Sequence, residues 1–123
     1  MKGGIGMIKI EAVIRPERVS QVSVALQDVG CGGFHYLNVT GQGQQHGVEV
    51  FTGRGGRTAT RAAMPKTLLV TVVKDDMKEA VIEAIVNSAR SEGEPAIGDG
   101  KIFISPVSDV VRVRTGERGE SAI

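Results

Sequence analysis

The sequence predicts a single α+β domain in which strands and helices follow one another in the order β-α-β-β-α-β, with a short extra strand at the end. Two kinds of pattern predict it. Four segments show the alternation or the β-branched apolar run of a strand, and two segments between them carry apolar residues at helical spacing. The 123 residues, 41% of them hydrophobic, suffice for one globular core and are too few for two.

The first half of the chain predicts a strand, a helix and a second strand. Residues 7–14 alternate apolar and polar side chains, as a half-buried strand does. Pro16 suits the first turn of the helix that follows, and Gly30 suits its end. The apolar residues between them recur at helical spacing: Val19, Val22, Leu26 and Val29. Phe34–Thr40 is predicted to be the second strand.

The second half of the chain predicts the same order of a strand, a helix and a strand. Residues 67–73 are almost wholly apolar, as a central strand would be. Asp75 and Asp76 are expected to cap the next helix. Its predicted apolar stripe consists of Met77, Val81, Ala84, Ile85 and Ser88. Lys101–Val107 is predicted as the fourth strand, and the alternating Val110–Arg114 as a short fifth.

This order is that of a ferredoxin-like sandwich, an antiparallel sheet with both helices on one face. The opposite face must meet solvent, a ligand or another subunit. Val13 and the apolar third strand make it a candidate interface between copies of the chain.

Composition argues against several classes of function. A net charge of +1, no Trp, one Tyr and three Phe do not favour nucleic-acid binding. The single Cys31 excludes an intrachain disulfide, and His35 and His46 lack the spacing of metal ligands. No apolar run reaches the length of a membrane helix, so we expect a cytoplasmic protein without membrane insertion. No catalytic constellation is evident, so we expect no enzyme.

Two segments near the C-terminus are candidate phosphate contacts. Arg112 and Arg114 would leave one face of a strand about 7 Å apart and could grip a polyphosphate, although charges on an edge strand also serve to prevent aggregation. Gly98, Asp99, Gly100 and Lys101 form a GDGK stretch that lacks the Walker A spacing. It predicts either an ordinary turn or a turn whose amides approach phosphates closely.

A glycine-rich loop and a lysine complete the candidates. Residues 41–63 form a long polar segment that begins with GQGQQHG, in which Gly41, Gly43 and Gly47 allow the backbone to wrap a ligand. Gln45 offers both a donor and an acceptor. Lys66, just before the third strand, is placed to pair with an anion.

Taken together and in this order, five segments resemble the PII nitrogen-regulatory signal-transduction family. They are IKIEAVIRP, GQGQQHG, MPKTLL, IGDGKIFI and VRVRTGERGESAI, and the resemblance covers nearly the whole chain from Met7. It implies one PII-type domain over residues 1–123, assembled as a homotrimer, with residues 1–6 as a disordered extension. It also implies that ATP or ADP binds in clefts between subunits and that Mg-ATP creates a site for 2-oxoglutarate.

The resemblance also implies roles for residues. The phosphates would be held by Gly98–Lys101 with Arg112 and Arg114, while Gly41 and Gly43 border the nucleotide and Val72 lies near the base. Gln45 would ligate Mg²⁺, and 2-oxoglutarate would be held by Gln45, Gly47 and Lys66. Two departures stand out: Val70 occupies a position that usually holds a base-contacting glutamate, and the loop contains no tyrosine for uridylylation.

Residues 44–63 would form the family's T-loop, which contacts regulated proteins. The resemblance implies a nitrogen-metabolism partner such as an ammonium transporter, glutamine synthetase or nitrogenase. Two alternatives remain open at this point. One is a PII-like sensor of another small anion, such as bicarbonate, with ADP as main ligand, and the other is a slow ATPase that uses the same cleft.

Overall fold

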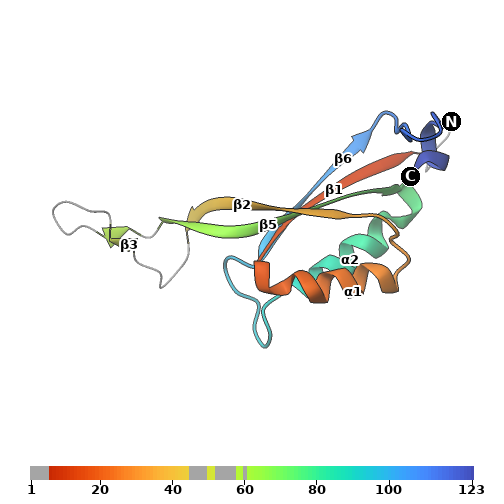
Figure 1. Cartoon of the computed structure of the whole chain (residues 1–123). Helices are drawn as coiled ribbons and strands as arrows, with labels where there is room; N and C mark the ends of the chain where they lie inside the picture. The colour runs from red at the N-terminus through yellow and green to blue at the C-terminus, as the bar shows by residue number, and fades with distance from the viewer. Residues whose placement is uncertain (1–5, 45–49, 52–57, 60) are drawn as a thin grey trace.

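The fold is a four-stranded antiparallel sheet with two helices packed on one of its faces. The structure is a computed structural model that describes residues 6–44, 50–51, 58–59 and 61–123. The strands that form the sheet are β1 (Met7–Ile14), β2 (His35–Gln44), β5 (Arg61–Lys74) and β6 (Gly100–Val107), and their order in the sheet is β2-β5-β1-β6. The helices are α1 (Val19–Asp28) and α2 (Lys78–Ala89). The predicted ferredoxin-like arrangement is confirmed (Figure 1).

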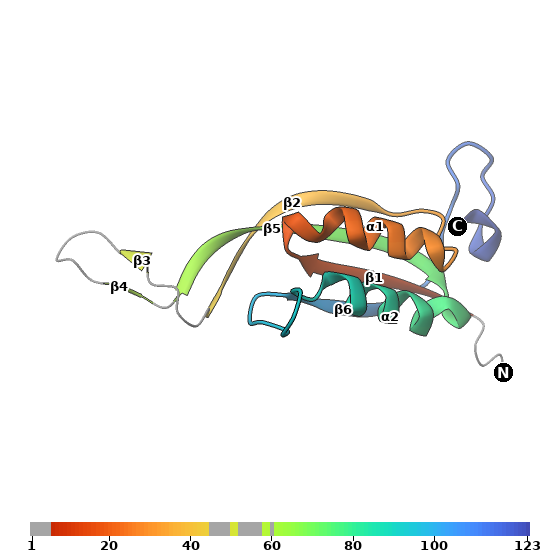
Figure 2. The same cartoon turned by 90° about the horizontal axis from the view of Figure 1, so that it is seen from below.

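Both helices cover the same face of the sheet, where they lie side by side (Figure 2). The helical stripes predicted from the sequence supply this core: Val22 and Leu26 of α1 and Val81 and Ile85 of α2 are fully or almost fully buried. From the sheet, alternate residues of β1 and two of β5 join them: Ile10, Ala12, Ile14, Leu69 and Val73. The buried apolar area of such side chains contributes roughly 1.5–3 kcal/mol each.

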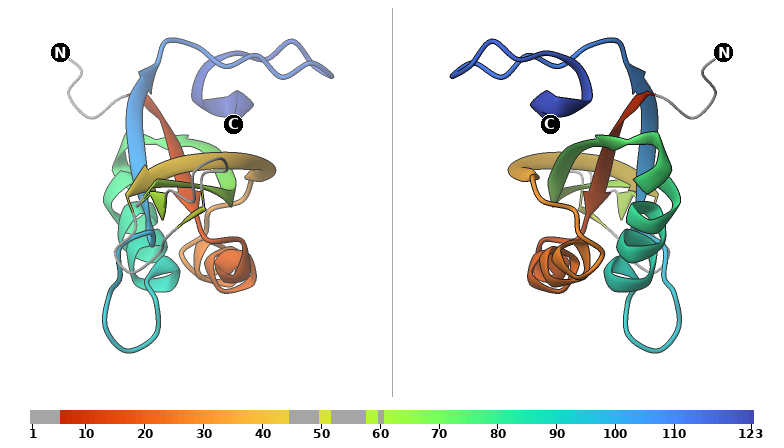
Figure 3. Two further views of the ribbon diagram at one scale, coloured as in Figure 1. Left: turned by 90° about the vertical axis from the view of Figure 1, so that its left-hand side faces the viewer. Right: turned by 90° about the vertical axis from the view of Figure 1, so that its right-hand side faces the viewer.

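The other face of the sheet, which we call the open face, is covered by no helix among the described residues. Leu37 and Phe103 project from it and keep 47% and 53% of their surface exposed. Figure 3 shows the C-terminal segment on this side of the sheet and the helices on the other. These exposed apolar side chains agree with the sequence-based expectation that this face is an interface between copies, which stays a prediction.

The start of α2 differs from the expectation. Asp75–Met77 forms a 3₁₀ turn, η3, ahead of α2, and no side chain caps either element. The prediction that Asp75 and Asp76 act as side-chain caps is therefore wrong. The 3₁₀ turn draws both residues inside the first turn, where their charges still lie near its positive end. At the other helix the prediction holds, since Pro16 opens the 3₁₀ turn η1 (Pro16–Arg18) that leads into α1.

The predicted polar segment at residues 41–63 is partly strand. β2 and β5 continue as a paired ribbon out to Gln44 and Arg61, because backbone hydrogen bonds need no apolar side chains. A short pair, β3 (Val50–Phe51) with β4 (Thr58–Ala59), lies beyond it. Residues 1–5, 45–49, 52–57 and 60 lie outside the described residues, as do the expectations that fall on them.

The prediction of a C-terminal strand at Val110–Arg114 is also wrong. Only Val111 forms a β-bridge, to Arg118, and the residues between them turn back on themselves. The amide of Arg112 donates to the Glu117 carbonyl at 2.9 Å, and that of Gly116 donates to the Arg112 carbonyl at 2.7 Å. The segment therefore pairs with itself, and Val113 stays 99% exposed. The chain ends in the 3₁₀ turn η4 (Gly119–Ala122).

Candidate functional site

The GDGK stretch is a tight turn that leads from a long loop into β6. Gly98 and Gly100 have φ values of +98° and +122°, a region that other residues rarely adopt. A Cβ on Gly100 would lie 1.9 Å from the carbonyl oxygen of Val13 on β1. The turn is thus pressed against the backbone of β1, where only glycine fits.

Lys66 approaches this turn from β5. Its Nζ donates to the Gly98 carbonyl oxygen at 2.6 Å, and its side chain is partly buried. On β2, a Cβ placed on Gly41 would lie 3.2 Å from Lys66 Cγ, so the glycine leaves room for the lysine stem. Burial lowers the pKa of Lys66, and the charge of Arg15 acts in the same direction, while Glu17 and Asp99 oppose them. An anion beside Lys66 would be favoured because it offsets this penalty.

Asp99 is bound inside the loop. Its carboxylate accepts hydrogen bonds from the amides of Ser91 and Ala96, at 3.1 and 2.9 Å, from the Ser91 hydroxyl and from Arg15 Nε. Burial raises the pKa of the Asp99 carboxyl, but the hydrogen bonds from Ser91, Ala96 and Arg15 outweigh it and hold the pKa well below its ordinary value. Asp99 is therefore a carboxylate whose two oxygens already have donors.

These residues gather at one end of the sheet, which we call the cradle end. The strand register brings them there: Gly100 pairs with Ile14, Ile14 pairs with Thr67, and Lys66 pairs with Val39. Gly43 lies further out on the β2–β5 ribbon, opposite Ala62. The cradle end therefore contains these residues expected from the sequence: Gly41, Lys66, Gly98, Asp99, Gly100 and Lys101.

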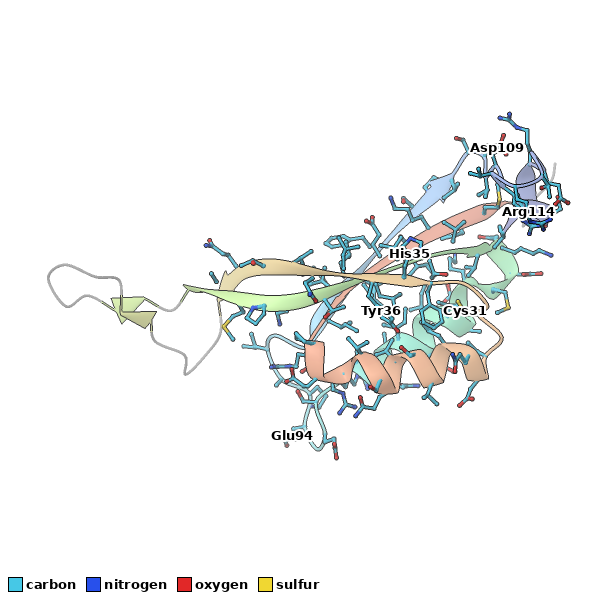
Figure 4. All side chains as sticks on the ribbon, in the orientation of Figure 1. Cys31, His35, Tyr36, Glu94, Asp109 and Arg114 are labelled. Atoms are coloured by element: carbon cyan, nitrogen blue, oxygen red, sulfur yellow. The ribbon has the colours of Figure 1, made fainter. Side chains whose placement is uncertain are left out.

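Three further expected residues, Val72, Arg112 and Arg114, lie at or beyond the other end of the sheet, which we call the arginine end. Val72 pairs with Lys9, and Arg112 and Arg114 follow the far end of β6. The seven residue steps along β6 from Gly100 to Val107 correspond to about 23 Å. Figure 4 labels Glu94, in the loop that leads into the turn, well away from Arg114.

At the arginine end the two guanidinium groups differ in their surroundings. Arg112 Nη1 pairs with Glu117 at 2.9 Å, and its Nη2 donates to the carbonyls of Ser121 and Ile123 at 3.2 and 3.4 Å. Arg114 is exposed. The fold therefore fixes Arg112 and leaves Arg114 open to solvent, and one chain does not bring either arginine to the glycine turn.

Sequence reasoning missed Arg15, Ser91 and Glu117. Arg15 looked like an ordinary charge after a strand, and Ser91 like part of a polar loop. Their contacts span up to 84 residues of sequence separation, as between Arg15 and Asp99, and no local pattern encodes such a pairing.

Two expected site residues are not described by the structure. Gln45 and Gly47 lie outside the described residues, so their expected contacts to Mg²⁺ and 2-oxoglutarate stay predictions. Within the described ranges, no group of three or more His, Cys, Asp or Glu is arranged to hold a metal ion. The helices in this part of the chain are also too short and too polar to cross a membrane.

Comparison with known proteins gives a family. The family model described as "Nitrogen regulatory protein P-II" matches residues 7–117. A nitrogen regulatory protein P-II from Cereibacter sphaeroides is 44% identical over 118 residues, which are 95% of this chain and the whole of that protein.

Solved structures agree with the sequence comparison. Arabidopsis thaliana PII bound to citrate superposes with a TM-score of 0.72 at 41% identity, over 97% of this chain and 94% of that one. The GlnK–ATP complex of B. subtilis gives 0.75 at 25% identity, over 96% and 98%. The chain belongs to the nitrogen regulatory P-II family, whose members are signal-transduction proteins and not enzymes.

Proposed function

We propose that this chain acts as a homotrimeric sensor that binds ATP or ADP in clefts between its subunits. The observation that carries the proposal is the separation of the two candidate half-sites. The glycine turn and Lys66 lie at the cradle end, while Arg112 and Arg114 follow the opposite end of β6, whose seven residue steps span about 23 Å. A polyphosphate that contacts both sets needs the cradle end of one copy and the arginine end of another.

The donor set at the cradle end fits phosphate. Two of the four residues in Gly98–Lys101 are glycines, so no side chain blocks the approach of a phosphate to their amides. Lys66 and Lys101 add positive charge. Arg112 and Arg114 of the neighbouring copy would add bidentate contacts. Gly41 and Gly43 would border the nucleotide, and Val72 would lie near its base. The ATP complex of the similar B. subtilis GlnK supports this ligand class.

The effector is proposed to be a small polycarboxylate, 2-oxoglutarate. Lys66 is a partly buried cation, and burial lowers its pKa. A carboxylate beside Lys66 is therefore favoured because it stabilises the charged form. The citrate complex of the similar Arabidopsis protein supports this chemistry. Gln45 and Gly47 would complete the site, and Mg²⁺ bound with ATP would be ligated by Gln45. Residues 44–63 would carry the signal to a partner in nitrogen metabolism, such as an ammonium transporter, glutamine synthetase or nitrogenase.

The test is calorimetry on the purified chain together with a mass measurement in solution. We expect a trimer that binds ATP and ADP competitively and binds 2-oxoglutarate only with Mg-ATP present. Coupling between two ligands is reciprocal, so 2-oxoglutarate must raise the affinity for Mg-ATP by the same factor as Mg-ATP raises the affinity for 2-oxoglutarate. The absence of nucleotide binding at millimolar concentration overturns the proposal. Bicarbonate with ADP is the matched effector screen, and binding of bicarbonate in place of 2-oxoglutarate overturns the effector assignment alone.

A further inference from the structure

The loop between α2 and β6 is held by a network of side chains that the proposed nucleotide contacts do not use. The loop runs from Arg90 to Asp99, and at its end the Asp99 carboxylate collects four donors. Two are the amides of Ser91 and Ala96, one is the Ser91 hydroxyl, and the fourth is Arg15 Nε at 3.1 Å. The first and last residues of this network are thereby joined across the whole loop.

Arg15 ties the same loop to the end of β1. Besides its contact with Asp99, its Nη2 donates to the Ile97 carbonyl oxygen at 3.0 Å. Lys66 then holds the Gly98 carbonyl oxygen at 2.6 Å. Three consecutive residues ahead of Gly100 are therefore each fixed by a long-range side-chain contact, and the side chains of Arg15 and Asp99 are only 25% and 16% exposed.

We propose that Arg15, Ser91 and Asp99 are positioning residues of the nucleotide site. Their side chains hold the Gly98–Lys101 turn in the shape that presents its amides to phosphate, without contacting the nucleotide. The inference rests on the proposed function. Its physical basis is preorganisation, because a glycine-rich turn that is not fixed beforehand loses conformational entropy when the ligand binds.

The replacement Asp99→Asn separates this role from simple electrostatics. All four neighbours of the carboxylate are donors, so an amide NH₂ in its place faces a donor and breaks the network. Positioning predicts that ATP and ADP bind about tenfold or more weakly. The lost negative charge alone predicts the opposite, since a polyanion is attracted more strongly when a nearby carboxylate is neutralised.

Glu94→Gln is the matched control. Glu94 lies in the same loop, is exposed and is labelled in Figure 4. Its replacement removes the same charge without removing any of the four contacts to Asp99, so nucleotide affinity should stay unchanged or rise slightly. A second pair, Ser91→Ala and Ser91→Thr, tests the hydroxyl: the alanine variant should weaken binding, and the threonine variant, which keeps the hydroxyl, should restore it.

Calorimetry with ATP and ADP measures the affinities, and hydrogen exchange of the ligand-free chain measures the turn directly. We expect faster exchange of the Gly98–Lys101 amides in Asp99→Asn and Ser91→Ala than in the native chain and in Glu94→Gln. If Asp99→Asn does not fold, as far-UV circular dichroism will show, the Ser91 pair decides.

The outcomes separate the two proposals. A native chain that binds nucleotide, with an Asp99→Asn variant that binds equally or more tightly, overturns this inference and leaves the proposed function standing. Equal affinities for Ser91→Ala and Ser91→Thr overturn it as well. A native chain that binds neither ATP nor ADP overturns the proposed function, and this inference with it.

Discussion

Lys66 and Gly98 are joined by a hydrogen bond of 2.6 Å from the lysine Nζ to the glycine carbonyl oxygen. This bond links β5 to the turn ahead of β6 and brings the partly buried cation of the cradle end onto the glycine turn. Any carboxylate that binds Lys66 therefore meets a group already in contact with the proposed phosphate cradle, which gives the two ligands a shared partner.

Replacement of Lys66 by methionine should weaken 2-oxoglutarate binding by about tenfold or more. The variant keeps the apolar stem against Gly41 and removes the charge, and a hydrogen bond to a charged group contributes about 1.5–3 kcal/mol. Calorimetry in the presence of Mg-ATP measures the loss. Lys74→Met is the control, since Lys74 is exposed at the opposite end of the same strand. An equal effect of both substitutions would contradict the assignment of Lys66.

Gly100→Ala should destabilise the fold more than Gly93→Ala. Both glycines have positive φ, +122° and +81°, so both substitutions introduce backbone strain of about 1–3 kcal/mol. Only at Gly100 does the new Cβ meet the Val13 carbonyl oxygen, at 1.9 Å, whereas nothing lies within 4 Å of it at Gly93. Urea unfolding of the two variants measures the difference. Equal losses of stability would show that the close approach at Gly100 has no energetic consequence.

Acid should destabilise the native chain more steeply than its Asp99→Asn variant. Burial raises the pKa of Asp99, but the hydrogen bonds that its carboxylate accepts lower this pKa by more, so the net shift is downward. The folded chain thus binds fewer protons at this group than the unfolded chain does. The resulting stability is complete above the unfolded pKa of about 3.9 and is lost as the pH falls toward the lower folded value.

Urea unfolding at a series of pH values from neutral downward checks this prediction. The stability difference between the native chain and Asp99→Asn should be largest near pH 7, at about 1–3 kcal/mol for the lost hydrogen bonds, and should shrink below about pH 4. Glu94→Gln is the control for the loss of one acidic group. Parallel pH profiles for the native chain and Asp99→Asn would contradict the role of Asp99 in the loop.

An aspartate at Phe103 or at Leu37 should break up the proposed trimer. Both side chains project from the open face and are about half exposed in the single chain, so their burial between copies would be lost and a charge would be placed there. Light scattering after size-exclusion chromatography measures the mass. Val24→Asp is the matched control, because Val24 is 57% exposed but lies on α1, away from the open face. Dissociation by Val24→Asp alone would place the interface on the helices instead.

Mixing two inactive chains should restore nucleotide binding if the site lies between copies. One variant carries Arg112→Ala and Arg114→Ala, and the other carries Lys66→Ala and Lys101→Ala. Each alone should fail to bind ATP while remaining a trimer. Trimers that contain both variants have one cleft with an intact cradle end and an intact arginine end, so calorimetry on the refolded mixture should detect partial binding. A mixture as inactive as its components would contradict a shared site.

Much of the fold was predictable because it is encoded in short periods of the sequence. The alternation of residues 7–14 and the stripe through Val22 and Leu26 each report locally which side chains are buried, and the structure confirms them. The errors concern the ends of elements. Asp75 and Asp76 lie inside a 3₁₀ turn. The segment Val110–Arg114 pairs with the residues that follow it, through Val111 and Arg118, because the alternation of a segment does not determine which other segment it hydrogen-bonds to.

The candidate site was predicted as a set of residues but not as an arrangement. The glycines, lysines and arginines were all visible as motifs, and the GDGK turn indeed has the positive φ values that favour glycine. The network that fixes this turn was not visible, since Arg15 reaches Asp99 across 84 residues and no local sequence pattern links the two.

The sequence by itself determined the order of the elements, the buried face of each helix and the chemical types available for an anion. These depend on side-chain periodicity and on residue identity, which are local properties. Only the tertiary structure decided where those groups stand. The register of β1 with β5 and β6 gathers Lys66 and Gly98–Lys101 at one end, and the direction of β6 carries Arg112 and Arg114 to the other. That separation follows from how strands pair over long sequence distances, and it is the reason for proposing that two copies of the chain build one site.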